Sequence, residues 1–99
     1  MANILVKHTV EDYDAWKPHY DDDASAREAH GERGYRLFHV SGEPNEIVMV
    51  FEWDSAENAR EFLESSDLRE VMEEAGVVGE PEIYFLDEIE AKTPETPTA

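Results

Sequence analysis

The sequence predicts one α+β domain, with a four-stranded antiparallel sheet and helices on one of its faces. The first observation behind this prediction is the order of the patterned segments, which runs strand, helix, strand, strand, helix, strand. That order is the ferredoxin-like, split β-α-β plan. The second is length, because 99 residues suffice for one such core. We assign residues 1–90 to the domain and expect the Pro/Thr-rich end, 91–99, to be disordered.

The first half of the chain predicts two strands around a long helix. Residues 3–9 (NILVKHT) and 35–41 (YRLFHVS) have strand composition. Between them, about 12–30, an amphipathic stripe recurs at spacings of three or four: Tyr13, Trp16, Tyr20, Ala24 and Arg27. Asp12 is the expected N-cap. Pro18 lies inside the stripe, so we expect a kink there or a later helix start.

The second half repeats this pattern. A turn at 42–45 leads into a strand at 47–53, and Asp54 or Ser55 caps the next helix, which Ser65-Ser66 interrupts. Asp67 and Glu70 have the spacing of a capping box that opens a short helix. Gly76 should end that helix in the left-handed conformation, and Pro81 leads into a last strand at 82–89.

The strand at 47–53 (IVMVFEW) is apolar on both faces. Ile47, Met49, Phe51 and Trp53 share one face, whereas Val48 and Val50 lie on the other. Helices on one side of a four-stranded sheet leave about 400 Å² of the other side bare. We therefore expect a homodimer in which two sheets pack face to face.

The net charge of the chain limits the kinds of partner that it can bind. The chain has 25 acidic and 8 basic residues, a net charge of −17, so nucleic acid and anionic membrane surfaces should be repelled. The acidic excess with three lysines is typical of a halophilic protein that accumulates salt, although an ordinary acidic protein is the alternative. Without cysteine, a disulfide or a thiolate metal site is excluded. No apolar span or secretory signal is visible, so we expect a cytoplasmic protein.

Three features together resemble a known family over residues 3–90. They are the order of elements, the strand end Phe51-Glu52-Trp53-Asp54 with Phe62 in the next helix, and Asp67-Leu68-Arg69-Glu70 followed by Ala75-Gly76. They resemble the antibiotic biosynthesis monooxygenase (ABM-like) group of the dimeric α/β-barrel superfamily. Its members include cofactor-free oxygenases that make quinones from polycyclic phenols, haem-degrading oxygenases, small isomerases and proteins of no established function.

The resemblance implies roles for two residues. Trp53 matches a pocket-lining Trp of the quinone-forming members, and Arg69 matches an Arg of their Leu-Arg-Glu segment. The chain also departs from the family: Met49 stands where members place an Asn, and Ala59 where they place a Tyr. Of the Asn, Trp and His used by the haem-degrading branch, Trp53 alone is matched.

Cofactor-free oxygenation needs an apolar pocket, a base and a group that stabilises the substrate anion. The candidate bases are His8 and His39; the candidate substrate contacts are Trp53, Phe51, Met49, Arg36, Arg69 and Tyr84. Several of these residues have a purely structural alternative. His8 would be a strand-end group with its hydrogen bonds satisfied, and Trp53 would belong to the dimer core. The two arginines would form surface ion pairs, Arg69 with Glu73. Asp21–Asp23 with His19 lacks a second histidine at ligand spacing, so we predict no metal site and a solvated acidic face.

Three functions remain open. The first is a dimeric, cofactor-independent monooxygenase, or a related enzyme, acting on an apolar aromatic small molecule. The second is a non-catalytic binding or structural dimer, and the third is a haem-binding or haem-degrading oxygenase. A cavity of about 300 Å³ or more lined by Trp53 and a histidine would favour the enzyme, whereas a filled interior would favour the second function.

Overall fold

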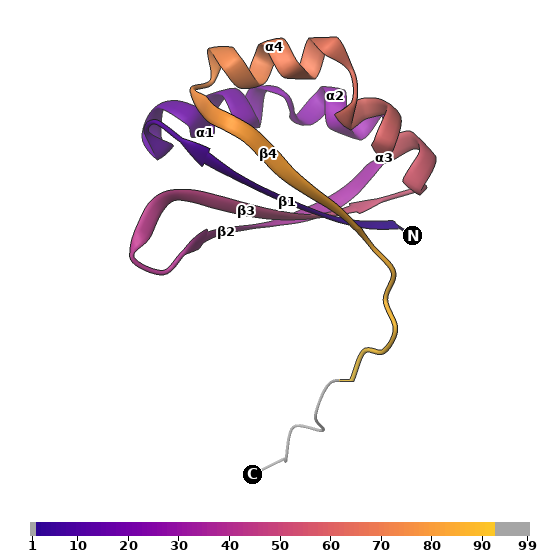
Figure 1. Ribbon diagram of the computed structural model, residues 1–99. Helices are drawn as coiled ribbons and strands as arrows, with labels where there is room; N and C mark the ends of the chain where they lie inside the picture. Colours follow the sequence, from indigo (N-terminus) through magenta and orange to yellow (C-terminus); the bar gives the residue numbers. More distant parts are fainter. Residues whose placement is uncertain (1, 93–99) are drawn as a thin grey trace.

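The computed structural model describes residues 2–92, apart from the side chains of Ser66 and Asp67. The elements follow the predicted order: β1 (Ala2–Val10), α1 (Tyr13–Asp22), α2 (Ala24–Ala29), β2 (Glu32–Val40), β3 (Glu43–Trp53), α3 (Ala56–Leu63), α4 (Ser66–Glu74) and β4 (Val77–Leu86). The strands form one sheet in the order β2-β3-β1-β4, with every neighbouring pair antiparallel. All the helices lie on one face of it (Figure 1). The ferredoxin-like plan is confirmed.

The core lies between the sheet and the helices. Cross-strand partners share a face, so the pairs Ile4↔Phe51 and Val6↔Met49 place alternate residues of β1 and β3 under the helices. These side chains are buried, as is Trp53 at the end of β3. Trp16 and Tyr20 of α1 and Phe62 of α3 close the core from above. The helix-covered face is therefore the one that carries Ile47, Met49, Phe51 and Trp53.

The opposite face of the sheet, called here the open face, is apolar and uncovered by any described element. Leu5 pairs with Val50 on one side and Tyr84 on the other, and Phe38 pairs with Val48. Phe38 is 42% exposed, Tyr84 52% and Leu86 41%. The two-sided apolar character predicted for the sheet is thus present.

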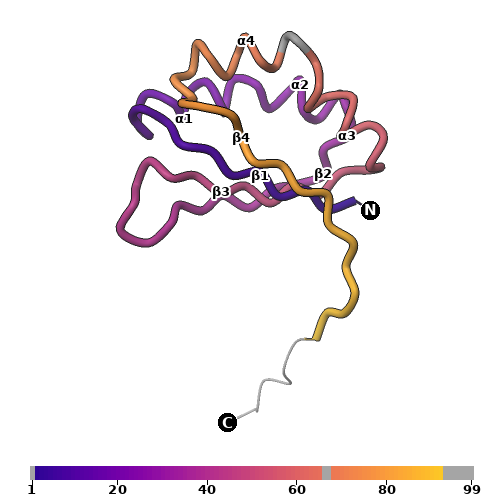
Figure 2. The backbone as a smooth tube through the Cα atoms, viewed as in Figure 1, coloured from indigo at the N-terminus to yellow at the C-terminus, as the bar shows by residue number. Residues whose placement is uncertain are grey.

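The long first helix breaks at a different place from the one predicted. Pro18 lies inside α1 without ending it. The helical segment is interrupted at Asp23, where α1 ends and α2 begins (Figure 2). Three consecutive aspartates have low helix propensity, which favours the break at that point. The break turns Asp23 into a junction residue between two helices.

Two boundaries in the second half also differ. Ser65 caps α4, because its Oγ accepts a hydrogen bond from the Leu68 backbone N–H at 3.2 Å, so the predicted Asp67 cap is wrong. Gly76, with φ +86°, ends α4 in the left-handed conformation as predicted. β4 begins at Val77 instead of Glu82, because an edge strand tolerates Pro81 and a register shift beside β1 absorbs Gly79. Residues 93–99 of the predicted tail lie outside the described residues.

Candidate active site

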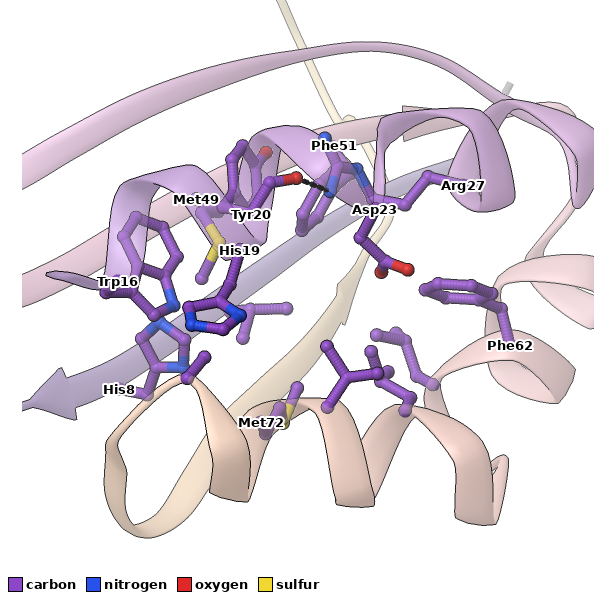
Figure 3. Close-up of a pocket in the computed structure, with 15 residues that line it drawn as sticks. His8, Trp16, His19, Tyr20, Asp23, Arg27, Met49, Phe51, Phe62 and Met72 are labelled. Carbon is purple, nitrogen blue, oxygen red and sulfur yellow. Dashed lines mark hydrogen bonds between the residues drawn. The ribbon is translucent and has the colours of Figure 1, made fainter.

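A small apolar pocket lies between the sheet and the helices, with a volume of about 50 Å³. Figure 3 shows α1 and α2 along one side of it and α4 along the other. Its apolar walls include Val6, Met49, Phe51, Phe62, Leu63 and Met72. The polar residues that border it are His8, His19, Tyr20, Asp23 and Arg27. Its volume is well below the ~300 Å³ of an ordinary ligand pocket.

The pocket opens between α1 and α4. His19 is exposed and Asp23 is half-buried on the α1 side. Leu68 and Met72 are half-buried on the α4 side. The residues beneath them, including Met49 and Phe51 of β3, are buried. A ligand would therefore pass between two helices to reach the floor formed by the sheet.

His8 sits on the floor of the pocket. Strand alternation points its side chain toward the helices, where it is 5% exposed and meets the Trp16 ring edge-on at 5.4 Å between ring centroids. Neither ring nitrogen has a hydrogen-bond partner among the described residues. Burial lowers the pKa of His8 to about 4. The imidazole is therefore neutral at neutral pH and has one nitrogen free to accept a proton.

Arg27 carries a positive charge into the core beside the pocket. Its guanidinium stacks on the Tyr20 ring, 3.9 Å from the centroid, and Nη1 donates to the Tyr20 carbonyl oxygen at 2.8 Å. Its Nε donates to the Glu32 carboxylate at 3.3 Å, which makes a buried ion pair. Burial raises the pKa of Glu32 more than the pairing with Arg27 lowers it. Arg27 Nη2 and the Tyr20 hydroxyl have no partner among the described residues.

Burial also acts on two other titratable groups at the pocket. It raises the pKa of Tyr20 well above its ordinary value, so the phenol stays protonated and can only be a neutral donor or acceptor. It raises the pKa of Asp23, whose carboxylate lies over the pocket and points toward Phe62 in Figure 3. Buried, partly unpaired groups around an apolar pocket are typical of functional sites.

The structure brings together three of the predicted site residues, His8, Met49 and Phe51. Trp53 is near them but lies in the core beneath α3, where its Nε1 donates to the His30 carbonyl oxygen at 2.8 Å. It packs against Phe51 and Phe62, with ring centroids 5.8 and 5.4 Å away. Trp53 therefore neither borders the pocket nor reaches the open face.

The other four predicted residues lie elsewhere. His39 is exposed on β2, with Nδ1 3.0 Å from the Val40 carbonyl oxygen. Arg36 and Tyr84 are on the open face, where Arg36 stacks over Phe38 at 5.0 Å. Arg69 is exposed on α4 and borders a separate surface groove. None of these four contributes to the pocket.

The sequence interpretation missed Trp16, Tyr20, Asp23 and Arg27 as site residues. A signal for Arg27 was available, because a charged residue in the apolar stripe of a helix must be paired or functional when it is buried. Among the described residues, no cluster of three His, Cys, Asp or Glu could hold a metal ion. No helix in the described part of the chain has the length and apolarity needed to cross a membrane.

The fold has close counterparts among solved structures. A protein from Bordetella bronchiseptica described as a proposed antibiotic biosynthesis monooxygenase is 15% identical, with a TM-score of 0.72 over 89% of this chain and 96% of its own. SnoaB of Streptomyces nogalater, a cofactor-independent oxygenase, is 14% identical, with a TM-score of 0.69 over 95% of this chain and 97% of its own. The fold is that of the antibiotic biosynthesis monooxygenases.

A protein of unknown function from Nitrosomonas europaea also matches this fold, at 13% identity and a TM-score of 0.69 over 96% of this chain and 95% of its own. No protein-family model matches the sequence. No curated protein sequence matches it either. The predicted resemblance to the antibiotic biosynthesis monooxygenases is confirmed as a likeness of fold.

Proposed function

We propose that the chain is a small-molecule enzyme of the cofactor-independent monooxygenase type, which binds an apolar aromatic substrate in the pocket between sheet and helices. The observation that carries this proposal is His8, a buried imidazole with both nitrogens unpartnered at an apolar pocket. A buried polar group without a partner costs about 1–3 kcal/mol. A bound ligand that supplies the missing hydrogen bond would offset that cost.

The proposed reaction uses molecular oxygen and no cofactor. His8 accepts the proton that an electron-rich phenol or its keto form gives up, and the substrate anion reacts with O₂. One oxygen atom becomes a carbonyl on the substrate, and the other leaves as water with the two hydrogens that the substrate loses. Although the pKa of free His8 is about 4, a substrate anion forming beside the ring would raise it and favour the transfer. SnoaB, described as a cofactor-independent oxygenase, supports this chemistry on such a fold.

The size of the pocket bears on the substrate. A volume of about 50 Å³ is less than an aromatic bicycle needs, so such a substrate must extend through the opening or displace α4. The volume is below the ~300 Å³ expected for the enzyme and Trp53 does not line the pocket, and both facts favour a second candidate, a module that binds a small apolar ligand without chemistry. Oxygen consumption separates the two functions.

The test uses 1-naphthol, because its oxidation to 1,4-naphthoquinone and water consumes one O₂ and places one oxygen atom in the product. We expect the wild type to consume oxygen and to incorporate the label from isotopic O₂ into the quinone. His8→Gln keeps a polar side chain but loses the base, and should lower the rate by roughly a hundredfold. His39→Gln, which alters an exposed histidine, should keep the full rate.

Three outcomes would contradict a cofactor-independent reaction that uses His8. Naphthol binding without oxygen consumption would establish the binding module instead. Equal rates for the wild type and His8→Gln would remove His8 from the reaction. A Soret band on addition of haem, with oxygen consumption that depends on haem, would favour the haem-binding alternative.

We also propose that two copies pair through the open face. The chain is strongly acidic, yet two of its eight basic residues, Lys7 and Arg36, lie on this face, where Lys7 is 3.8 Å from Glu46. Because Glu46, Glu52 and Glu82 lie on the same face, the two cations offset only part of its negative charge. The apolar side chains Leu5, Val48, Val50, Phe38, Tyr84 and Leu86 supply the area to bury. A second copy is the partner that presents a matching surface.

A further inference from the structure

The acidic run at the end of α1 has three members in three different environments. Asp21 is paired with Lys17, whose Nζ lies 2.6 Å from Oδ1. Asp22 is exposed. Asp23 is half-buried and borders the pocket. Whereas the first two form the solvated face predicted for the run, Asp23 does not belong to it.

The ordinary local roles for the Asp23 carboxylate are not used. It occupies the N-cap position of α2, where an aspartate commonly accepts a backbone N–H, but its side chain makes no capping hydrogen bond. The cation one turn later, Arg27, pairs with Glu32 instead. The carboxylate is turned over the pocket, toward Phe62 (Figure 3). It is a strong acceptor facing an apolar space.

A second, independent feature of the same pocket indicates a ligand. His8 is 5% exposed and its ring nitrogens have no partner among the described residues, although it borders the same space from the sheet. The walls between it and Asp23 are largely apolar, with Met49 and Phe51 on the sheet side and Met72 on the α4 side. Besides Arg27 Nη2 and the Tyr20 hydroxyl, which also lack a partner among the described residues, the pocket thus offers a polar contact on its floor and another at its opening.

We infer that Asp23 is a ligand-binding residue, which accepts a hydrogen bond from a hydroxyl or ammonium group of the ligand at the opening of the pocket. This inference rests on the proposed function, and it deepens that function by naming the substrate class. The ligand is an apolar or aromatic molecule that carries a hydrogen-bond donor on the part that remains at the opening. This donor is a second polar group, separate from the phenol or keto group whose proton His8 accepts, and its contact with Asp23 orients that reacting group toward His8.

The same geometry selects against carboxylates and phosphates. An anionic ligand would meet the like charge of Asp23 in a half-buried place, where repulsion is screened less than at the surface. Arg27 faces the same pocket with an unpartnered Nη2, but its single positive charge stands against the two carboxylates of Glu32 and Asp23, so the net charge of this group stays negative. The strongly negative net charge of the chain acts in the same direction.

The test uses three ligands with one ring and different polar groups: benzylamine, benzyl alcohol and benzoate. Their affinities are measured by NMR titration of the labelled full-length protein. We expect the wild type to bind benzylamine most tightly and benzoate most weakly. Asp23→Asn has the same shape but no charge, and should weaken benzylamine binding about fivefold. The difference between the affinities for benzylamine and benzoate should become smaller in this variant.

Asp22→Asn is the matched control, because it removes the same charge one residue away from an exposed position. It should change each affinity by less than about twofold. Equal losses in the two variants, or benzoate binding as tightly as benzylamine to the wild type, would overturn the inference but leave aromatic binding in place. If none of the three ligands shifts resonances of the pocket residues, both the inference and the proposed function fail. An unchanged spectrum of the free Asp23→Asn protein confirms its fold.

Discussion

At the scale of single residues, the site depends on a histidine that is kept neutral by its surroundings. His8 lies beneath Trp16 with no partner for either nitrogen, and burial lowers its pKa to about 4. An unfolded chain would hold the same side chain at its ordinary pKa of 6.5. Between these values the unfolded chain binds a proton that the folded chain does not. The stability that depends on neutral His8 is therefore complete above about pH 6.5 and is lost as the pH falls toward 4.

We predict a measurable pH dependence from this difference. Relative to the wild type, His8→Gln should gain stability as the pH falls from 6.5 to 4, by at most about 3 kcal/mol, because glutamine has no proton to take up. Urea unfolding of both proteins across this range measures the difference, in which the many carboxylates common to both cancel. His39→Gln should show no such gain. If the difference in free energy of unfolding between His8→Gln and the wild type did not change with pH, His8 would not be buried as described.

The sequence allowed some of these residues to be placed and not others. Alternation along β3 correctly put Met49 and Phe51 on one face, and the pairing with β1 adds His8. Alternation alone does not tell which face the helices cover, so Arg36 and Tyr84 were grouped with the site although they lie on the open face. The sequence interpretation also failed to identify pocket residues on the helices. Asp23 sits in a charge run that is elsewhere solvated, although its spacing of three from Tyr20 and seven from Trp16 places it on the inward side of the helix.

At the scale of elements, the plan of the fold was predictable because each segment has a distinct period. The residues at which the elements begin and end were less predictable, because they depend on tertiary contacts. Pro18 is accommodated within α1, and β4 extends back to Val77 because it pairs with β1 along an edge where Pro81 loses no ladder hydrogen bond. Trp53 was expected at a pocket or an interface, whereas the helix α3 covers it.

The open face gives the element-scale prediction. Val50 is central in β3, between Leu5 of β1 and Arg36 of β2, so a carboxylate there should oppose sheet packing. We expect the wild type to sediment at twice its 11.3 kDa chain mass at micromolar concentration in molar KCl, and Val50→Glu to sediment as a monomer. Ala15→Glu, on the exposed side of α1, adds the same charge and should remain dimeric. A monomeric wild type, or a dimeric Val50→Glu protein with a native circular dichroism spectrum, would contradict the dimer.

At the scale of the whole molecule, the two faces of one sheet have separate proposed roles. The helix-covered face holds the pocket with His8 and Asp23, and the open face is left for a second copy. β3 contributes to both, because Met49 and Phe51 point to the pocket while Val48 and Val50 point away from it. A ligand that uses the pocket must therefore affect alternate residues of a single strand.

The most direct test of this division follows the side-chain methyl groups by NMR as 1-naphthol is added to the wild-type protein. The account predicts that the methyl resonances of Met49, Val6 and Met72 shift together and saturate, while those of Val48 and Val50 stay in place. Saturating shifts at Val48, Val50 and Leu86 with the pocket methyls unmoved would put the ligand on the open face and contradict the proposed site.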